Sequence, residues 1–133
     1  DWEGPITISR FNQKAAERGY SFTPVVQLSQ VGWRVLLLEI VRKLAGGVGD
    51  IHDTGRRGAS LPAGWAPMKA WSVGGAEAVA LAQKLAPAMA AKREQAAAVA
   101  AYPLWAKGRA AVPEAIFAER ERLFEVCKAA NAR

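Results

Sequence analysis

Apolar residues recur with helical spacing between Thr23 and Gly46. At 3.6 residues per turn, one set shares a face of a helix: Val26, Trp33, Leu37, Ile40 and Leu44. A second set falls on nearly the opposite face: Leu28, Val31, Val35 and Leu38. A helix that is apolar on two faces packs between neighbours. The pattern therefore predicts a long, buried central helix.

The ends of this segment carry helix boundary signals. Thr23 followed by Pro24 favours a helix start, because a threonine oxygen caps free N–H groups and proline fits the first helical position. Gly46 and Gly47 favour a stop. The uninterrupted apolar run 35–38 is much shorter than the roughly 20 residues that cross a bilayer. We therefore expect no transmembrane segment.

The flanking segments also favour helices. Ile6 and Ile8 alternate with polar residues and could form a short extended stretch, but we expect no sheet because no partner strand is evident. A short helix is predicted from Arg10 to Arg18. Pro87 should kink the alanine-rich helix expected from Ala76 to Ala101 or split it in two, and Pro113 should open a last helix.

The least regular part of the chain is residues 47–75, which are rich in glycine and proline. Loops of this length are commonly functional or disordered. Trp65 and Trp71 argue against simple disorder, because disordered linkers contain few aromatic residues. We expect an ordered lid that its tryptophans fix to the core.

Composition agrees with a helical class. The chain of 133 residues is rich in alanine and carries few β-branched residues, which favours helix. Its length predicts one domain with its own core. The expected fold is therefore all-α: a single helical domain over 1–133, with four to five helices around a central helix at about 23–46 and an irregular loop at about 47–75.

The single cysteine and the first residue give weaker constraints on the fold and on the origin of the chain. Cys127 is the only cysteine, which excludes an intramolecular disulfide, and its apolar neighbours in the last helix predict a core position. The chain starts at Asp1 without a basic and apolar leader. We expect a processed product, a trimmed chain or a domain cut from a longer one.

The formal net charge is +6, and the excess lies between Arg56 and Arg109. A basic segment beside two neutral ones indicates an anionic partner, nucleic acid or an acidic protein surface. The alternative is that an alanine-rich surface needs charge for solubility.

One flexible stretch, Gly49 to Gly58, concentrates reactive side chains. The sole histidine, His52, stands between Asp50 and Asp53 and could act as a general base that a carboxylate orients, or belong to an oxygen-rich metal site. Glu39 could add an acid, as in glycan hydrolases whose two carboxylates lie about 5–9 Å apart. The alternatives are a solvated polar turn, and for Glu39 an ion pair with Lys43. We predict neither a metal nor a cofactor.

Candidate binding residues are mainly cationic. Arg56 and Arg57 could hold a phosphate with their forked guanidinium groups, although GRRG lacks the spacing of a phosphate-binding loop. The remaining candidates, from the basic segment, are Lys69, Trp71, Lys92 and Arg93. Trp71 could stack on a base, whereas its alternative role is in the core.

These features predict a small, basic helical protein that binds an anionic partner, either nucleic acid or an acidic protein surface. Two alternatives remain: a hydrolase-type effector or toxin domain with a site at Glu39, Asp50, His52 and Asp53, or a structural subunit that assembles with copies of itself. Whether the protein is an enzyme stays open at this stage, and so does a homo- or hetero-oligomeric state. No catalytic, zinc or nucleotide-binding signature stands out.

Overall fold

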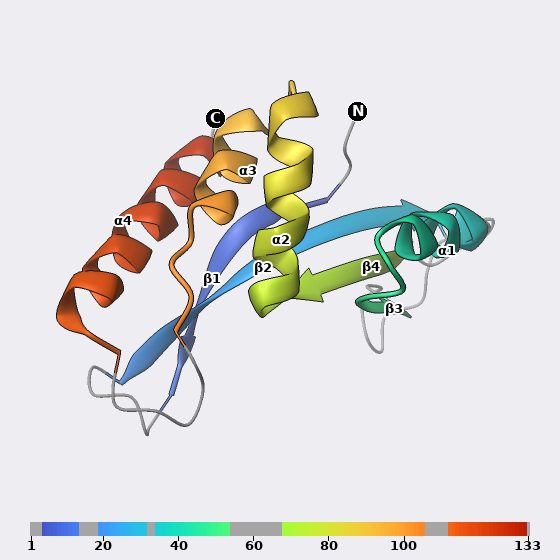
Figure 1. The fold of residues 1–133 in the computed structure, drawn as a ribbon. Coiled ribbons are helices and arrows are strands. Elements are labelled where there is room, and N and C mark those ends of the chain that lie inside the picture. The colour runs from blue at the N-terminus through green and yellow to red at the C-terminus, as the bar shows by residue number, and fades with distance from the viewer. Residues whose placement is uncertain (1–3, 14–18, 32–33, 54–67, 106–111, 133) are drawn as a thin grey trace.

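The computed structural model describes residues 4–13, 19–31, 34–53, 68–105 and 112–132. It has an α/β fold in which helices lie on one side of a four-stranded antiparallel sheet (Figure 1). The predicted all-α bundle is therefore wrong. No helix in the described ranges is both long and apolar enough to span a membrane.

The sheet has the strand order β1-β2-β4-β3. Its strands are β1 (Ile6–Asn12), β2 (Tyr20–Val31), β3 (Asp50–Asp53) and β4 (Met68–Gly74). The long strand β2 pairs with β1 along its first half and with β4 along its second half. All three pairings are antiparallel. β2 is thus the organising element of the sheet.

The predicted central helix was wrong in its first half, which is strand β2. Phe22, Pro24, Val26 and Leu28 are buried, and the odd-numbered residues between them are less so, which is the two-residue period of a strand. The helical interpretation had placed Val26 and Leu28 on opposite faces. Pro24 is tolerated inside β2 because the pairing with β4 begins only at Val25.

The alternation at Ile6 and Ile8 marks a true strand, contrary to the expectation that no sheet forms. Its partner is β2: Ile6 lies opposite Val26, and Ile8 lies opposite Pro24. The predicted helix from Arg10 is also wrong over residues 10–12, which belong to β1. Gln13 belongs to no helix, and the rest of that prediction, residues 14–18, lies outside the described residues.

Helix α1 (Val35–Leu44) retains the second half of the predicted helix. Its predicted end is confirmed: Gly46 and Gly47 have φ of 93° and 80°, a left-handed conformation that glycine adopts without steric strain. In place of the single irregular loop, the chain then forms the edge strand β3 and later β4.

The C-terminal half forms the helical layer. It comprises α2 (Gly75–Leu85), the 3₁₀ turn η2 (Ala86–Ala88), α3 (Arg93–Ala100) and α4 (Glu114–Asn131). The break at Pro87 and the helix start after Pro113 are both confirmed. Small alanines at 78, 82, 96 and 98 are buried, which lets α2 and α3 approach closely.

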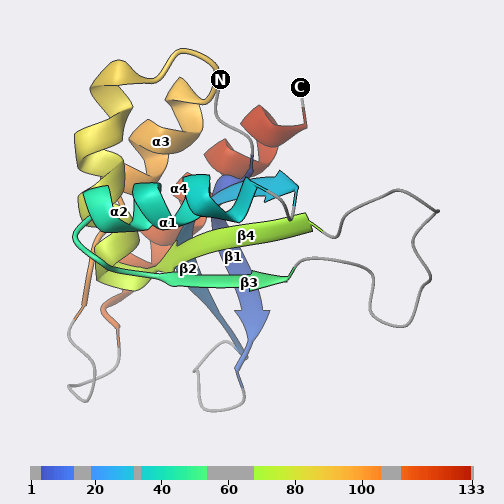
Figure 2. The same ribbon diagram turned by 90° about the vertical axis from the view of Figure 1, so that its right-hand side faces the viewer.

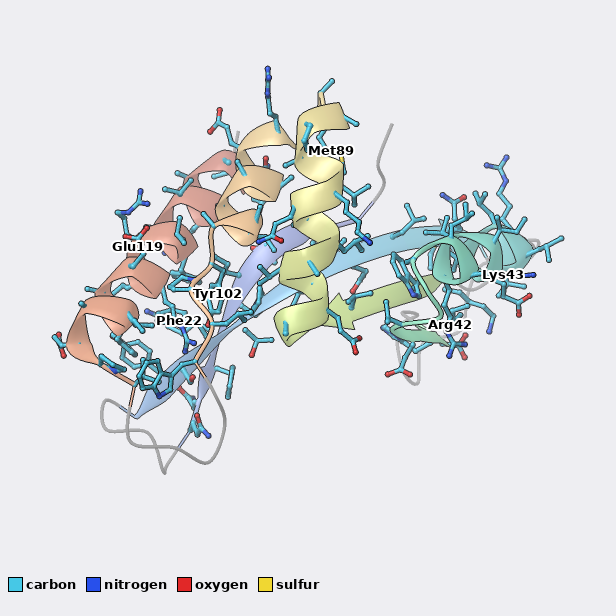
Figure 3. The ribbon with its side chains drawn as sticks, in the orientation of Figure 1. Phe22, Arg42, Lys43, Met89, Tyr102 and Glu119 are labelled. Carbon is cyan, nitrogen blue, oxygen red and sulfur yellow. The ribbon has the colours of Figure 1, made fainter. Side chains whose placement is uncertain are left out.

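The core lies between the sheet and this layer. Figure 3 shows Phe22 of β2 and Tyr102 close together, and the Tyr102 hydroxyl donates to the Phe22 carbonyl at 3.1 Å. The Phe22 ring also packs against Phe117 and Phe124 of α4. Cys127 is fully buried, as predicted. The described helices cover one face of the sheet, and none of them lies on the other face (Figures 1 and 2).

Candidate nucleic-acid interface

The face of the sheet that points away from the helices is the candidate interface, and we call it the open face. Because side chains alternate along a strand and paired residues share a face, the register identifies its members. They alternate with the buried core residues, and all but Ala70 are partly or fully exposed. The open face includes Ser9, Thr23, Val25, Gln27, Ser29, Asp50, His52, Ala70 and Ser72.

Gln27 lies at the centre of the open face and is half-buried. It lies directly opposite Ser72 of β4, whose hydroxyl donates to Gln27 Oε1 at 2.9 Å. Gln27 Nε2 in turn donates to the hydroxyl of Ser29 at 3.4 Å. These contacts orient the amide across the sheet. Amide and hydroxyl groups both donate and accept hydrogen bonds. The row formed by Gln27, Ser29 and Ser72 therefore suits a planar ligand with polar edges.

The open face is nearly uncharged. Among its members named above, only Asp50 and His52 are titratable, and both are exposed on the edge strand β3. β2 and β4 contribute hydroxyl, amide and small apolar side chains there. The face by itself is therefore suited to directional hydrogen bonding, and cations for an anionic partner must come from around it.

The predicted catalytic residues do not meet at one site. Asp50 and His52 lie on the open face, whereas Asp53 lies on the helix-facing side of β3, opposite Lys69. Glu39 is exposed on α1, which lies on the helical side of the sheet (Figure 2). In the described part of the chain, no three His, Cys, Asp or Glu side chains are grouped to hold a metal ion.

Asp53 and Lys69 form a cross-strand ion pair. The Lys69 ammonium donates to Asp53 Oδ1 at 2.7 Å. This hydrogen bond and the lysine charge lower the pKa of Asp53 below its ordinary value. Lys69 is thereby engaged within the sheet, on the face opposite to Gln27.

The predicted binding residues separate into different environments. Trp71 is fully buried, and its indole donates to the Val48 carbonyl, so its ring has no free face for a base. Arg56 and Arg57 lie outside the described residues. Lys92 and Arg93 stand at the start of α3, where Arg93 is exposed and Lys92 is half-buried.

Lys92 links α3 to the chain segment that enters β1. Its ammonium donates to the backbone carbonyl of Gly4, 88 residues earlier. Gly4 has φ of 129°, and a Cβ there would lie 2.4 Å from the Gln27 carbonyl oxygen. Only glycine permits this approach. Lys92, Gly4 and the backbone of Gln27 therefore lie close together, a grouping that the sequence interpretation missed because it placed Gln27 in a helix.

Among solved structures, the chain is similar to homing endonucleases. It matches I-CvuI in complex with its target with a TM-score of 0.57 and 15% identity, over 96% of this chain and 86% of that one. It matches a double lysine-to-alanine mutant of I-SmaMI with a TM-score of 0.60 and 13% identity, over 96% and 38%. The chain shares their fold.

A third similar structure is the LAGLIDADG meganuclease I-CpaMI bound to uncleaved DNA. Its TM-score is 0.51 at 14% identity, over 90% of this chain and 45% of that one. No protein-family model and no curated protein sequence matches the chain. At these identities the likeness establishes the fold, and function has to be argued from this chain's own residues.

Proposed function

We propose that the protein binds double-stranded DNA with its open face and reads base edges there. The observation that carries this proposal is the row formed by Gln27, Ser29 and Ser72 on the sheet face that no described helix covers. Strands can enter the major groove of B-DNA, where each base pair displays a distinct pattern of donors and acceptors. Two of the similar structures are complexes with target or uncleaved DNA, which supports this choice of partner.

Gln27 is the central reader in this proposal. A glutamine amide pairs with adenine by accepting from N6 and donating to N7, and serine hydroxyls pair with either kind of edge. Ser72 donates to Gln27 Oε1, and this hydrogen bond favours the amide orientation in which the oxygen points toward β4. Binding would then favour adenine at the base pair that faces Gln27.

Phosphate contacts would come from the segments between the strands and helices. Residues 14–18, 54–67 and 106–111 together carry six cations: Lys14, Arg18, Arg56, Arg57, Lys107 and Arg109. All six lie outside the described residues. Lys and Arg contacts to phosphates supply most non-specific affinity for DNA and make it fall with salt. The net charge of +6 agrees with contacts between these cations and phosphates.

The test is selection from a pool of random duplex DNA, followed by affinity measurement on the selected sequence. Gln27→Ala should weaken binding about tenfold, within the range expected for one bidentate pair, and should relax the preference at one base pair. Gln30→Ala is the matched control, since Gln30 lies three residues along β2, opposite Lys69 on the other face. Equal effects of the two changes, or no binding at low salt, would overturn the proposal.

We also propose that the protein hydrolyses the DNA it binds. The observation in favour is the contact of Lys92 with Gly4, because two of the three residues before Gly4 in the sequence, Asp1 and Glu3, are carboxylates. Two of the similar structures are named as a homing endonuclease and a meganuclease, which supports nucleic-acid cleavage as the reaction to test. Asp1 and Glu3 lie outside the described residues.

Carboxylate oxygens are the donors that divalent cations such as Mg²⁺ and Ca²⁺ prefer, so Asp1 and Glu3 would hold such an ion. A bound cation would supply Lewis-acid stabilisation of phosphate charge. Lys92 would add a fixed positive charge beside the same backbone, held there by its bond to Gly4. Its role would be to neutralise the phosphate that approaches this end of β1.

Cleavage can be tested separately from binding, on plasmids that contain the selected sequence. With Mg²⁺ present, Glu3→Gln and Lys92→Met should each lower the cleavage rate at least tenfold, while binding in Ca²⁺ changes little. Lys84→Met, at an exposed lysine on α2, is the control and should cleave normally. An unaltered rate in Glu3→Gln, or intact plasmid with the unmodified protein bound, would refute hydrolysis and leave the binding proposal standing.

A further inference from the structure

Helix α1 presents an apolar stripe to solvent. Its buried side is anchored by Leu38, which is fully buried against the sheet. Four large apolar side chains on the other side are exposed, with exposed fractions between 44% and 82%: Leu36, Leu37, Ile40 and Leu44. Leu36, Ile40 and Leu44 follow one another every four residues and so lie in one row. A row of this kind on such a short helix indicates a contact surface.

One flank of the stripe carries charges of opposite sign. At 100° per residue, Glu39 and Lys43 both fall beside the row of Leu36, Ile40 and Leu44, on the side away from Leu37. Both side chains are exposed, and in the described part of the chain neither makes an ion pair. The ion pair expected between them from the sequence is therefore not formed. Figure 3 shows Lys43 on α1 at the end of the molecule farthest from α4.

We infer that the α1 stripe is a self-association surface that packs against α1 of a second copy in antiparallel orientation. A two-fold contact is self-complementary, so residue i of one copy meets residue j of the other and j meets i. When two helices pack antiparallel through the same stripe, the same flank of each meets the other in reversed order. Glu39 of one copy then lies opposite Lys43 of the other, twice.

The charge order selects this partner and this orientation. In a parallel pair, the flank with Glu39 and Lys43 would face the opposite flank, where Val41 lies at the level of these charges and the nearest charge, Arg34, lies before the helix. An antiparallel second copy matches both the apolar row and the charges of the flank. The inference stands independently of DNA binding.

The small size of the surface indicates a weak association. A standard stable interface buries about 800 Å² per partner, from 20 to 30 residues on each side. The four exposed apolar residues of α1 and the two charged residues on their flank are far fewer than the residues of such an interface. Self-association should therefore be weak, with a dissociation constant in the range of tens to hundreds of micromolar.

The first experiment is sedimentation equilibrium of the whole chain across this concentration range. The protein should shift from monomer to dimer, and Ile40→Glu should weaken dimerisation at least tenfold by placing a charge in the apolar row. Leu104→Glu is the matched control, because Leu104 is 50% exposed and lies on the segment after α3. Far-UV circular dichroism confirms that both variants stay folded.

The second experiment tests orientation by charge exchange. Glu39→Lys and Lys43→Glu should each weaken self-association, since each places like charges across the two-fold axis. An equimolar mixture of the two single variants should form mixed dimers, and the chain with both changes should regain the original dimer. This pattern is specific to an antiparallel pair and a folding defect would not produce it.

Three results would overturn the inference. The first is a monomer at all concentrations. The second is a dimer that Ile40→Glu leaves unchanged, which would place the contact elsewhere. The third is a mixture of the two charge variants that stays monomeric while the unmodified chain dimerises, which would exclude the antiparallel pairing.

Discussion

The indole N–H of Trp71 in β4 donates to the backbone carbonyl of Val48 at 2.8 Å. Val48 belongs to the connection that leads from α1 into β3, so this bond joins that connection to the sheet. Trp71 is fully buried between Leu28 and Ile51 of the neighbouring strands. A tryptophan in this position stabilises the fold and cannot stack on a base.

Replacing Trp71 tests this role. Trp71→Phe should lower the free energy of unfolding by about 2–3 kcal/mol, because it removes one hydrogen bond and leaves a cavity in the core. Urea unfolding measures the change. Trp105→Phe is the control, since Trp105 is 38% exposed, and its effect should be below about 1 kcal/mol. A binding defect in Trp71→Phe under conditions where it stays folded would contradict a purely structural role.

Two glycines near this connection allow a matched comparison. Gly47 and Gly49 have nearly the same φ, 80° and 82°. A Cβ at Gly47 would meet nothing within 4 Å, whereas at Gly49 it would lie 2.5 Å from the Ser72 carbonyl oxygen and 2.7 Å from Trp71 Nε1. The two positions therefore share the conformational cost of a side chain and differ in the space available.

Gly47→Ala should lower stability by about 1–2 kcal/mol, the cost of the left-handed conformation alone. Gly49→Ala should lower it by at least about 2 kcal/mol more, because the backbone of β4 has to shift. Thermal or urea unfolding of the two variants gives the difference directly. Equal losses of stability would mean that the space between Gly49 and β4 is large enough for a methyl group.

The sequence predicted the second half of the chain better than the first. Pro87 and Pro113 set helix boundaries through local geometry, so those boundaries could be located without any tertiary contact. Cys127 could be placed in the core because its apolar neighbours repeat with the period of one helix. Local signals were sufficient there.

The first half failed because its residues fit two periods. Val26 and Leu28 satisfy a two-residue alternation as well as one stripe of a two-sided helix, and only the pairing of β2 with β1 and β4 decides between them. Strand β4 was not predicted because it lies in a segment rich in glycine and proline. The open face was missed for the same reason, because Gln27 and Ser72 are 45 residues apart and meet only through this pairing.

A buried guanidinium joins α4 to the segment after α3. Arg120 Nε donates to the Pro103 carbonyl at 2.9 Å, and the guanidinium lies 4.8 Å from the centre of the Tyr102 ring. Burial raises the pKa of Tyr102, and the positive charge of Arg120 partly opposes that rise. A raised pKa means that the folded state holds the phenolic proton more tightly. Stability should therefore fall as pH increases above about 10.

Arg120→Met keeps most of the side-chain volume and removes the charge. The pKa of Tyr102 should rise further, and the free energy of unfolding should drop by about 1–3 kcal/mol because the Pro103 carbonyl loses its partner. Ultraviolet absorbance of the phenolate in a Tyr20→Phe background reports Tyr102 alone, since the chain has two tyrosines. An unchanged or lowered pKa would show that the guanidinium does not act on the ring.

Cys127 provides a probe of core integrity because it is the only cysteine and is fully buried on α4. Burial raises the pKa of its thiol to about 11, against a smaller opposing effect from a hydrogen bond with the Ile8 backbone. The reactive species is the thiolate, and each unit of pKa reduces its population tenfold near neutral pH. Labelling by a disulfide reagent at about pH 8 should therefore be at least about 100-fold slower in the folded protein than in concentrated guanidinium.

The same shift has a consequence for stability, with a definite sign. The unfolded thiol loses its proton near its ordinary pKa, while the folded thiol keeps it until about pH 11. The folded state thus binds more protons in that window, and stability should decline from about pH 9 to about 11. Cys127→Ala should remove this part of the alkaline decline, although its smaller side chain lowers stability at every pH. Rapid labelling of the folded protein at about pH 8 would instead place the thiol at a surface, and the packing of α4 against β1 would have to be revised.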